Sequence, residues 1–517
     1  RPSSYAIAPP RPKPRPTVNP AADARADRDP PRRAILVVRP RAVMIAGSYA
    51  GNMTAGLDPR DPNMPDPHRA LDASAAQGSR LYLYLVSAVA AVGGLLFGYD
   101  TAVISGAGTY VKDHFRLDAA AEGFMVSSLL VGCMIGAGAA GTISDRLGRK
   151  RVLLAAAVLY VVSAVLAGLP RTLTELVVAR FVGGLAVGVS SMVSPMYIAE
   201  IAPARIRGAL VTLNQMAIVT GILLAYLACG LLVEAGRDNW RWMFASAAVP
   251  ALGLFIALTY VPESPRWLAK QGLFEPAFDV LARVGGAAHA GSELAEIRES
   301  LARETGSLRD LFAPGLRLAL LVAVVLAVLG QISGINAVIY YGPRIFQQAG
   351  FVQKADSVWA TVPIGVTNMI VTVVSLAIID RIGRRPLLAI GTAGMAASMV
   401  LAGLRMGSDT LHPAAKVAII LLYVASFGLG VGGVVWVVIS EIFPNKVRGR
   451  GVAIATVAVW GACLAVAQTF PVLQELLRER VFFIYAVLAG LMCAFVLAFV
   501  PETRGRSLEQ IERAWSR

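Results

Sequence analysis

The chain has 517 residues, with 48 Lys and Arg against 33 Asp and Glu, so its formal net charge is +15. Hydrophobic residues make up 56% and charged residues only 16%, and the mean hydropathy is +0.61. A soluble domain has about 25% charged residues. These values exclude most classes of soluble enzyme and indicate a polytopic membrane protein. The basic residues outside the N-terminal segment lie mostly in short loops between apolar runs, which argues against a nucleic-acid-binding stripe.

Residues 1–80 differ from the rest, because they hold 14 of the 29 prolines and show no periodic apolar pattern. We expect this segment to be disordered. The sequence begins with Arg1, so part of the segment is expected to be translated upstream sequence, with Met44, Met53 or Met64 as the natural start. The alternative is a cytoplasmic regulatory tail.

From Leu81 onward, long apolar runs alternate with short polar breaks, and a membrane span needs about 20 residues. Only helices cross a bilayer at such lengths. We therefore predict an all-α membrane protein in which two six-helix halves, 81–261 and 316–500, flank a polar helical insert at 262–315 and precede a tail at 501–517. The twelve predicted spans are 81–106, 120–143, 152–169, 173–198, 208–233, 241–261, 316–346, 357–379, 386–404, 415–440, 451–474 and 481–500.

Alternate loops carry clusters of Lys and Arg, such as the one around Arg149, whereas Arg171 stands alone in its loop. Loops rich in these residues stay on the cytoplasmic side. Both termini and the insert are therefore predicted to be cytoplasmic, in a multi-pass protein of the cell membrane.

The chain contains an internal repeat. Asp145-Arg-Leu-Gly-Arg-Lys150 returns as Asp380-Arg-Ile-Gly-Arg-Arg385, and Glu200-Ile-Ala-Pro returns as Glu441-Ile-Phe-Pro. Pro262-Glu-Ser-Pro-Arg266 is echoed by Pro501-Glu-Thr-Arg504. Nearly constant offsets predict two homologous halves, which place a substrate site at their common midplane and expose it alternately.

The charged residues of these motifs form a candidate gate at the cytoplasmic side. A network that rearranges between two states biases their populations, although single exposed pairs contribute only about 0–1 kcal/mol. The alternative is that the charges only set the topology. The candidate gate residues are Asp145, Arg146, Arg149, Glu200, Arg207, Glu263, Arg266, Asp380, Arg381, Arg384, Glu441, Arg448 and Glu502.

Over about residues 81–512, the chain resembles the sugar porters of the major facilitator superfamily. The loop motifs alone resemble the wider superfamily. The sugar-porter features are Arg180-Phe-Val-Gly-Gly184, Pro262-Glu-Ser-Pro-Arg-Trp267, Gln331-Ile-Ser-Gly-Ile-Asn-Ala-Val-Ile-Tyr-Tyr341 and Pro501-Glu-Thr-Arg-Gly-Arg506.

Two charges inside predicted spans, Asp100 and Arg180, are candidate proton-coupling residues. Burial destabilises the carboxylate and the cation stabilises it, so a carboxyl between these effects is poised for protonation. The resemblance implies the same role, because proton-coupled sugar porters carry an acid at this place. The alternative is a purely structural ion pair. Some proton-coupled members of the family carry a second acid on span 6. This chain has Ala247 after Ser246 there and lacks that acid.

A sugar site needs amides that pair with hydroxyls and aromatic faces for C–H patches. Gln331 and Asn336 are five residues apart, so they share a face only if span 7 is unwound, and Gly330, Gly334 and Pro343 favour breaks there. Each amide alone also fits helix–helix packing. The candidate substrate-binding residues, with their roles implied by the resemblance, are Phe97, Gln215, Gln331, Asn336, Tyr340, Tyr341, Asn368, Trp436 and Trp460.

The chain departs from the family pattern at several positions. Gly330 replaces a glutamine, Gly433 removes a proline break from span 10, and Val459 and Cys463 replace polar residues beside Trp460. We expect an altered or looser sugar preference. Gly428-Leu-Gly-Val-Gly-Gly433 matches a dinucleotide pattern, but it lies within an apolar span and is better explained by helix packing.

The predicted function is import of a monosaccharide or polyol by proton symport with alternating access, without a cofactor, a metal ion, nucleic acid or enzymatic activity. The partners are a sugar or polyol, the proton and the lipid bilayer, and the functional unit is expected to be a monomer. The alternatives are a facilitative uniporter, a non-transporting sugar sensor and, less consistent with the amides, a drug exporter.

Overall fold

The computed structural model describes residues 78–303, 308–313, 316–444 and 447–504. The expected disorder of residues 1–80 and the three candidate start methionines thus fall almost wholly outside the described residues and stay predictions. Every regular element in the described ranges is helical.

The first half consists of long helices with side-chain caps at several starts. Ser79, Asp118 and Thr172 each accept a hydrogen bond from a backbone N–H in the first turn of the following helix, which satisfies one free donor of that turn. The helices are α3 (Arg80–Phe115), α4 (Ala119–Leu147), α5 (Arg149–Gly168), α6 (Leu173–Ile201), α7 (Arg207–Leu232), α8 (Asn239–Ala245) and α9 (Ala248–Tyr260).

The second half repeats this pattern with more interruptions. Its helices are α13 (Leu316–Ile332), α14 (Ile335–Gln348), α15 (Lys354–Trp359), α16 (Val362–Ile382), α17 (Arg384–Arg405), α18 (Pro413–Phe427), α19 (Val434–Glu441), α20 (Arg448–Leu477) and α21 (Val481–Phe499). Eleven helical stretches in the described residues are long and apolar enough to cross a membrane. The last of them, Arg448–Phe499, is 52 residues long and contains two spans, α20 and α21, which meet at Arg478 with a left-handed φ of 53°. The twelve predicted spans are thus accounted for.

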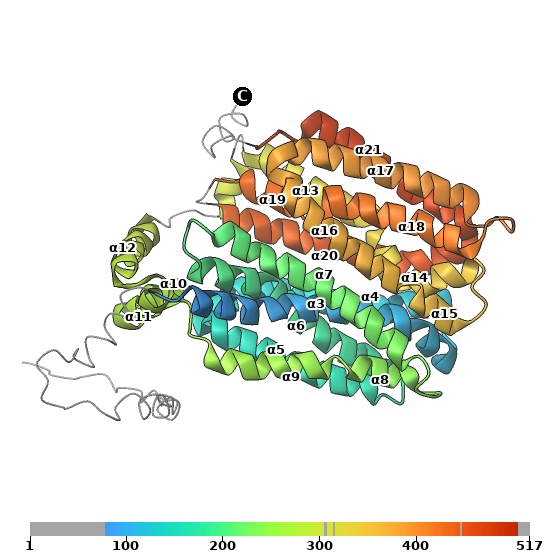
Figure 1. Cartoon of the computed structure of the whole chain (residues 1–517), viewed down its shortest axis with the longest axis horizontal. Helices are drawn as coiled ribbons and strands as arrows, with labels where there is room; N and C mark the ends of the chain where they lie inside the picture. The colour runs from blue at the N-terminus through green and yellow to red at the C-terminus, as the bar shows by residue number, and fades with distance from the viewer. Residues whose placement is uncertain (1–77, 304–307, 314–315, 445–446, 505–517) are drawn as a thin grey trace, which may run out of the picture. The chain divides into compact units, whose positions relative to one another are not determined.

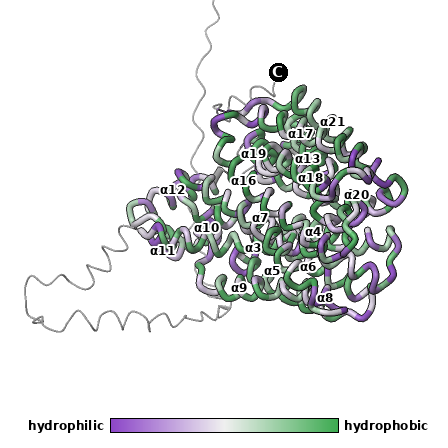
Figure 2. Tube along the Cα trace, turned by 45° about the vertical axis from the view of Figure 1, so that its right-hand side comes forward, coloured by the Kyte–Doolittle hydropathy of each residue, from purple (hydrophilic) through white to green (hydrophobic). Residues whose placement is uncertain are grey.

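Three short helices of the insert lie beyond one end of the spans: α10 (Pro265–Lys270), α11 (Phe274–Gly285) and α12 (Ala287–Arg303) (Figure 1). We call this end of the spans the insert end, and the opposite end, where α8 and α15 lie, the far end. The tube is hydrophobic along the spans and more hydrophilic in the insert and connecting loops (Figure 2). The predicted domain boundaries remain predictions.

The second span of each half packs on the fifth span of the other half. The second helix of the first half, α4, packs on α20, and the fifth, α7, packs on α16. Within the first half α4 crosses α6 so closely that a Cβ at Gly184 would overlap the carbonyl oxygen of Leu129. Large apolar side chains such as Leu231 and Val249 are 74% exposed, which is the surface that a bilayer covers.

Three spans differ in detail from the sequence prediction. The first continues to Phe115 instead of ending near 106, and the sixth is divided into α8 and α9. The tenth is interrupted by a π-helical segment at Gly428–Gly432 although it has no proline there. In this segment the Cα of Gly430 packs against Gly391 of α17, which agrees with close helix packing for the glycine-rich pattern.

Candidate functional site

Span 7 is broken between α13 and α14. Gly334 has φ +110°, which side-chain-bearing residues rarely adopt, and a Cβ there would lie 2.9 Å from the ring of Tyr485. The carbonyl of Ser333, freed by the break, accepts a hydrogen bond from the Tyr423 hydroxyl at 3.1 Å. The predicted unwinding of this span is therefore present, and its cause is a glycine that faces an aromatic ring.

The break brings two predicted amides together. Asn336 donates from Nδ2 to Oε1 of Gln331 at 2.9 Å, and the same Nδ2 lies 3.3 Å from the Sγ of Cys463 on α20. Cys463 in turn contacts Gln331 Oε1 at 3.4 Å. The thiol therefore lies beside the hydrogen bond that joins the two amides, where it offers a weaker polar partner than an amide side chain would.

An aromatic pair joins the two halves next to this cluster. Phe97 of α3 and Trp460 of α20 lie with ring centroids 5.3 Å apart and tilted by 54°. The indole N–H of Trp460 is buried and has no hydrogen-bond acceptor among the described residues. A buried donor without a partner is rare and is suited to a ligand oxygen.

The other predicted substrate residues show no hydrogen bond to Gln331 or Asn336 among the described residues. Tyr340 and Tyr341 are buried on α14, where the Tyr341 hydroxyl donates to the Ala467 carbonyl at 2.6 Å. Asn368 is buried on α16, whereas Gln215 of α7 and Trp436 of α19 are half-buried. Among the described residues, no hydrogen bond links these last three to the Gln331 cluster, so their contact with sugar stays a prediction.

Asp100 and Arg180 face each other inside the first half. The Nη1 of Arg180 lies 3.9 Å from Oδ1 of Asp100, and both residues are at least nine-tenths buried. Oδ2 of Asp100 and Nε of Arg180 have no hydrogen-bond partner among the described residues, and the guanidinium lies over the Phe244 ring at 5.4 Å. The two side chains are therefore buried and lie farther apart than a hydrogen bond. Protonation of the carboxylate removes its attraction to the guanidinium.

At the insert end, Arg149 organises the charges of the first half. Its guanidinium contacts Glu200 through Nε at 2.9 Å and Nη2 at 2.8 Å, and Nη1 lies 3.0 Å from Asp145. Asp145 is also contacted by Lys270 of α10 at 3.0 Å, and Glu200 accepts a hydrogen bond from Ser264. The network therefore ties α4, α5 and α6 to the start of the insert.

The second half has the same arrangement. Arg384 lies 3.0 Å from Asp380 and 3.1 Å from Glu441, as Arg149 does with its own partners. Thr503 donates to Glu441 at 2.5 Å, in the role that Ser264 has in the first half. The sequence repeat is thus a repeat of contacts.

In each half a glutamate caps the N-terminus of the helix that begins at the network arginine, which is α5 in the first half and α17 in the second. Glu263 accepts hydrogen bonds from the backbone N–H groups of Arg149 and Lys150, and Glu502 from those of Arg384 and Arg385. Burial alone raises the pKa of Glu502, but these donors and the N–H groups of Arg504 and Thr503 outweigh it and hold the pKa below its usual value. A carboxylate at a helix N-terminus is also favoured by the helix dipole.

The remaining predicted gate residues are more peripheral. Arg207 contacts Glu293 of α12 at 3.1 Å, and Arg266 donates to Ser300 at 3.2 Å, so both join the insert to itself or to the first half. Arg448 donates to the Phe443 carbonyl, whereas Arg146 and Arg381 are exposed. The gating role of all these residues stays a prediction.

The sequence analysis missed a charged cluster at the far end. Arg344 of α14 forms an ion pair with Glu122 of α4 and donates to Gln474 of α20 at 2.8 Å. Lys112 of α3 lies 3.0 Å from Glu122 and 3.5 Å from Glu475. Glu122 and Arg344 lie inside predicted spans, so the rule that singled out Asp100 also applies to them.

Comparison with known proteins agrees with this architecture. The family model "Sugar (and other) transporter" matches residues 86–515. The arabinose-proton symporter of Bacillus subtilis is 41% identical over 462 residues, which cover 88% of this chain and 99% of that protein. The D-xylose-proton symporter of Escherichia coli K12 is 39% identical over 476 residues, covering 84% and 96%.

The fold is similar to solved structures as well. A partially occluded inward-open conformation of the xylose transporter XylE from E. coli has a TM-score of 0.74 and 36% identity, and covers 83% of this chain and 100% of that one. The predicted fold and transport function are thereby confirmed, and the chain is a multi-pass integral membrane protein of a transporter family, not an enzyme. It belongs to the sugar transporter family.

Proposed function

We propose that this protein imports a monosaccharide or polyol by proton symport, with Asp100 as the proton-binding group. The curated relatives include symporters for arabinose and D-xylose at about 40% identity, which supports coupling to the proton and a small sugar as the solute. The alternatives are a facilitative uniporter and a sugar sensor that does not transport.

The observation that carries the proposal is the buried pair of Asp100 and Arg180. An ionised carboxylate inside a span is costly, by about 2.5–3.5 kcal/mol on insertion scales, and is retained where it has a function. Protonation of Asp100 removes its attraction to Arg180 and frees the guanidinium. A facilitative carrier needs no such group.

The solute site in this proposal lies around Gln331 and Asn336, with Phe97 and Trp460 as its aromatic faces. Amide groups pair with adjacent hydroxyls, and aromatic faces contact the C–H patches of a sugar. Because Phe97 and Trp460 contact each other from different halves, a solute that binds against this aromatic pair contacts both halves. Binding and rearrangement of the halves are thereby coupled.

The insert end is proposed to be cytoplasmic, as are both termini. The Arg-rich loops after α4 and α16 and the insert lie at this end, and such loops stay inside. The two Arg–Glu networks then form the cytoplasmic gate in a cell-membrane protein that functions as a monomer.

The decisive experiment is Asp100→Asn in the purified protein reconstituted in liposomes. With an imposed pH gradient, the wild type is expected to accumulate a labelled sugar above equilibrium, and a protonophore abolishes this. The variant is expected to lose accumulation while keeping sugar exchange between the two sides.

The matched control is Asp409→Asn, in an exposed loop, which leaves accumulation unchanged. Full accumulation by Asp100→Asn would refute the proton role. Wild-type transport that ignores the protonophore indicates a uniporter, and sugar binding without any transport indicates a sensor.

A further inference from the structure

The hydroxyl of Ser163 and the carboxyl group of Asp100 approach each other beside Gly183. A Cβ on Gly183 would lie 2.4 Å from the Ser163 hydroxyl oxygen and 2.9 Å from Oδ2 of Asp100. Asp100 belongs to α3, Ser163 to α5 and Gly183 to α6, so three helices of the first half meet at this point. The glycine leaves no side chain between the two oxygens.

The Ser163 hydroxyl is able to accept a further hydrogen bond. It donates to the Ala179 carbonyl of α6 at 2.9 Å, and the residue is only 5% exposed. A hydroxyl has one proton to donate and two lone pairs that accept. Among the described residues no donor bonds to this oxygen, so its lone pairs remain available.

Oδ2 of Asp100 is the atom that needs an acceptor once it carries a proton. Asp100 is 8% exposed, and within the described ranges Oδ2 has no hydrogen-bond partner. A buried O–H group without an acceptor is rare, because it has lost its hydrogen bonds to water and gained nothing in return. A protonated Asp100 therefore requires an acceptor inside the protein.

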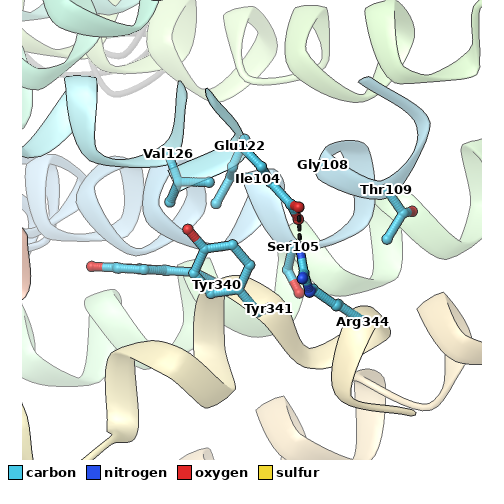
Figure 3. Close-up of a pocket in the computed structure, with 9 residues that line it drawn as sticks. All are labelled: Ile104, Ser105, Gly108, Thr109, Glu122, Val126, Tyr340, Tyr341 and Arg344. Atoms are coloured by element: carbon cyan, nitrogen blue, oxygen red, sulfur yellow. Dashed lines mark hydrogen bonds and ion pairs between the residues drawn. The ribbon is translucent and has the colours of Figure 1, made fainter. Parts of the chain in front are cut away.

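Bulk water reaches this part of the first half poorly from the far end. Figure 3 shows Glu122 and Arg344 paired beside a small pocket between α3, α4 and α14. This pocket has room for about one water molecule. While the far end is closed in this way, a proton on Asp100 depends on a protein acceptor.

Arg180 is the charged group that faces Asp100. Of the other helices around this part of α3, α7 and α8 carry Tyr226 and Arg241, which bond or stack elsewhere. The remaining titratable groups near the pair are a thiol and two phenols, which are uncharged at neutral pH. They are Cys133 of α4, Tyr160 of α5 and Tyr340 of α14.

We propose that Ser163 is a positioning residue for the coupling proton, and that protonated Asp100 donates from Oδ2 to the Ser163 hydroxyl. The proposal rests on the proposed role of Asp100 in proton symport. One proton from solution forms the O–H bond and cancels the negative charge of the carboxylate. The carboxyl group then turns from Arg180 toward Gly183, and Ser163 keeps its own proton on the Ala179 carbonyl. Ser163 thereby stabilises the protonated form of Asp100 over the ionised form.

The test is Ser163→Ala in the purified full chain in liposomes, followed by infrared difference spectra between neutral and acid pH. The C=O band of a protonated carboxyl that is absent from Asp100→Asn belongs to Asp100. In Ser163→Ala this band is expected at higher wavenumber, because the O–H group has lost its acceptor. It should also appear at a pH about half to one unit lower, the effect of one hydrogen bond.

The matched control is Ser398→Ala. Ser398 on α17 follows Arg384 at the same spacing as Ser163 on α5 follows Arg149, and its buried hydroxyl donates to the Gly394 carbonyl of its own helix. This variant is expected to leave the Asp100 band unchanged. Ser163→Cys, which keeps a weaker acceptor of similar size, should give a smaller shift than Ser163→Ala.

Sugar accumulation gives a second readout, since its half-maximal pH should shift to lower values in Ser163→Ala by the same amount. An equal loss of accumulation at every pH would indicate a merely structural role and would overturn the proposal. An Asp100 band that ignores Ser163→Ala, or that responds equally to Ser398→Ala, would overturn it as well. Absence of any Asp100 band in the wild type would instead contradict the proposed proton role of Asp100, so the two failures are distinguishable.

Discussion

Arg344 on α14 forms an ion pair with Glu122 on α4, and so joins the second half to the first at the far end. Two more pairs join the halves there, Lys112 with Glu475 and Lys354 with Asp113. At the insert end, the Arg149 network joins the first half to the insert and the Arg384 network joins the second half to Thr503, so neither network joins one half to the other. In this conformation the described ion pairs therefore hold the far end closed.

Glu122→Gln is expected to shift the equilibrium toward a conformation that is open at the far end. Loss of a charged hydrogen bond costs the closed state about 1.5–3 kcal/mol, which is at least a tenfold change in population. Spin labels at the exposed positions Leu169 and Leu476, one in each half, report the change as a longer distance.

The control for this variant is Glu175→Gln, whose carboxylate accepts from Arg171 within the first half. It is expected to leave the distance distribution unchanged. If Glu122→Gln does the same, the ion pair does not hold the two halves together.

Gly183→Ala is expected to weaken proton coupling. A Cβ at this position would lie 2.9 Å from Asp100 Oδ2 and overlap the Ser163 hydroxyl, so the carboxylate must move relative to Arg180. Sugar accumulation driven by a pH gradient should fall severalfold, whereas exchange should fall less. Gly138→Ala, where a Cβ meets nothing within 4 Å, is the control, and equal losses in both variants would argue against the effect on Asp100.

Gly334→Ala is expected to destabilise the protein by about 1–2 kcal/mol, because the left-handed backbone disfavours a Cβ and the Tyr485 ring leaves no room for it. The midpoint of thermal unfolding should fall by a few degrees and the sugar affinity should drop, since Gln331 and Asn336 no longer meet. Gly490→Ala on α21, in open space, should show neither change. A stable variant with normal affinity would show that the break tolerates a side chain.

Glu502→Gln is expected to lower stability near neutral pH but not in acid. The pKa of Glu502 is lower in the folded protein than its ordinary value of 4.5, so its charge stabilises the fold above that value. This stabilisation is lost as the pH falls through the lowered pKa. Melting curves of wild type and variant from pH 7 to about pH 3 should therefore converge in acid. Glu234→Gln in an exposed loop is the control, and a pH-independent difference for Glu502→Gln would contradict the assignment.

Much of the architecture was predictable because its causes are local. The apolar runs predict the spans, the spaced repeats predict the equivalent Arg149 and Arg384 networks, and Gly334 predicts the break in span 7. The contact of Asp100 with Arg180 followed from the rarity of charges in spans.

Other features depend on which helices meet in space. Pairing of Glu122 with Arg344 requires α4 and α14 to lie together, which no spacing along the chain indicates. From the sequence, Cys463 was interpreted as replacing a polar residue of the family pattern. In the structure its thiol still contacts both Gln331 and Asn336. The first span extends to Phe115 because helical hydrogen bonds continue through Lys112 and Asp113, where the hydropathy signal ends.

The two glutamate caps have a consequence for how such a chain changes over time. A Cβ on Gly148 would strike the carboxylate of Glu263, and one on Gly383 would strike that of Glu502. Each glycine is therefore constrained by a glutamate more than a hundred positions away in the sequence. A substitution of one member of the pair affects the fit of the other. Because the chain holds this glycine–glutamate pair twice, a substitution in one half leaves the pair in the other half unchanged. Comparison of the two single variants with the double variant then shows whether the two pairs act together.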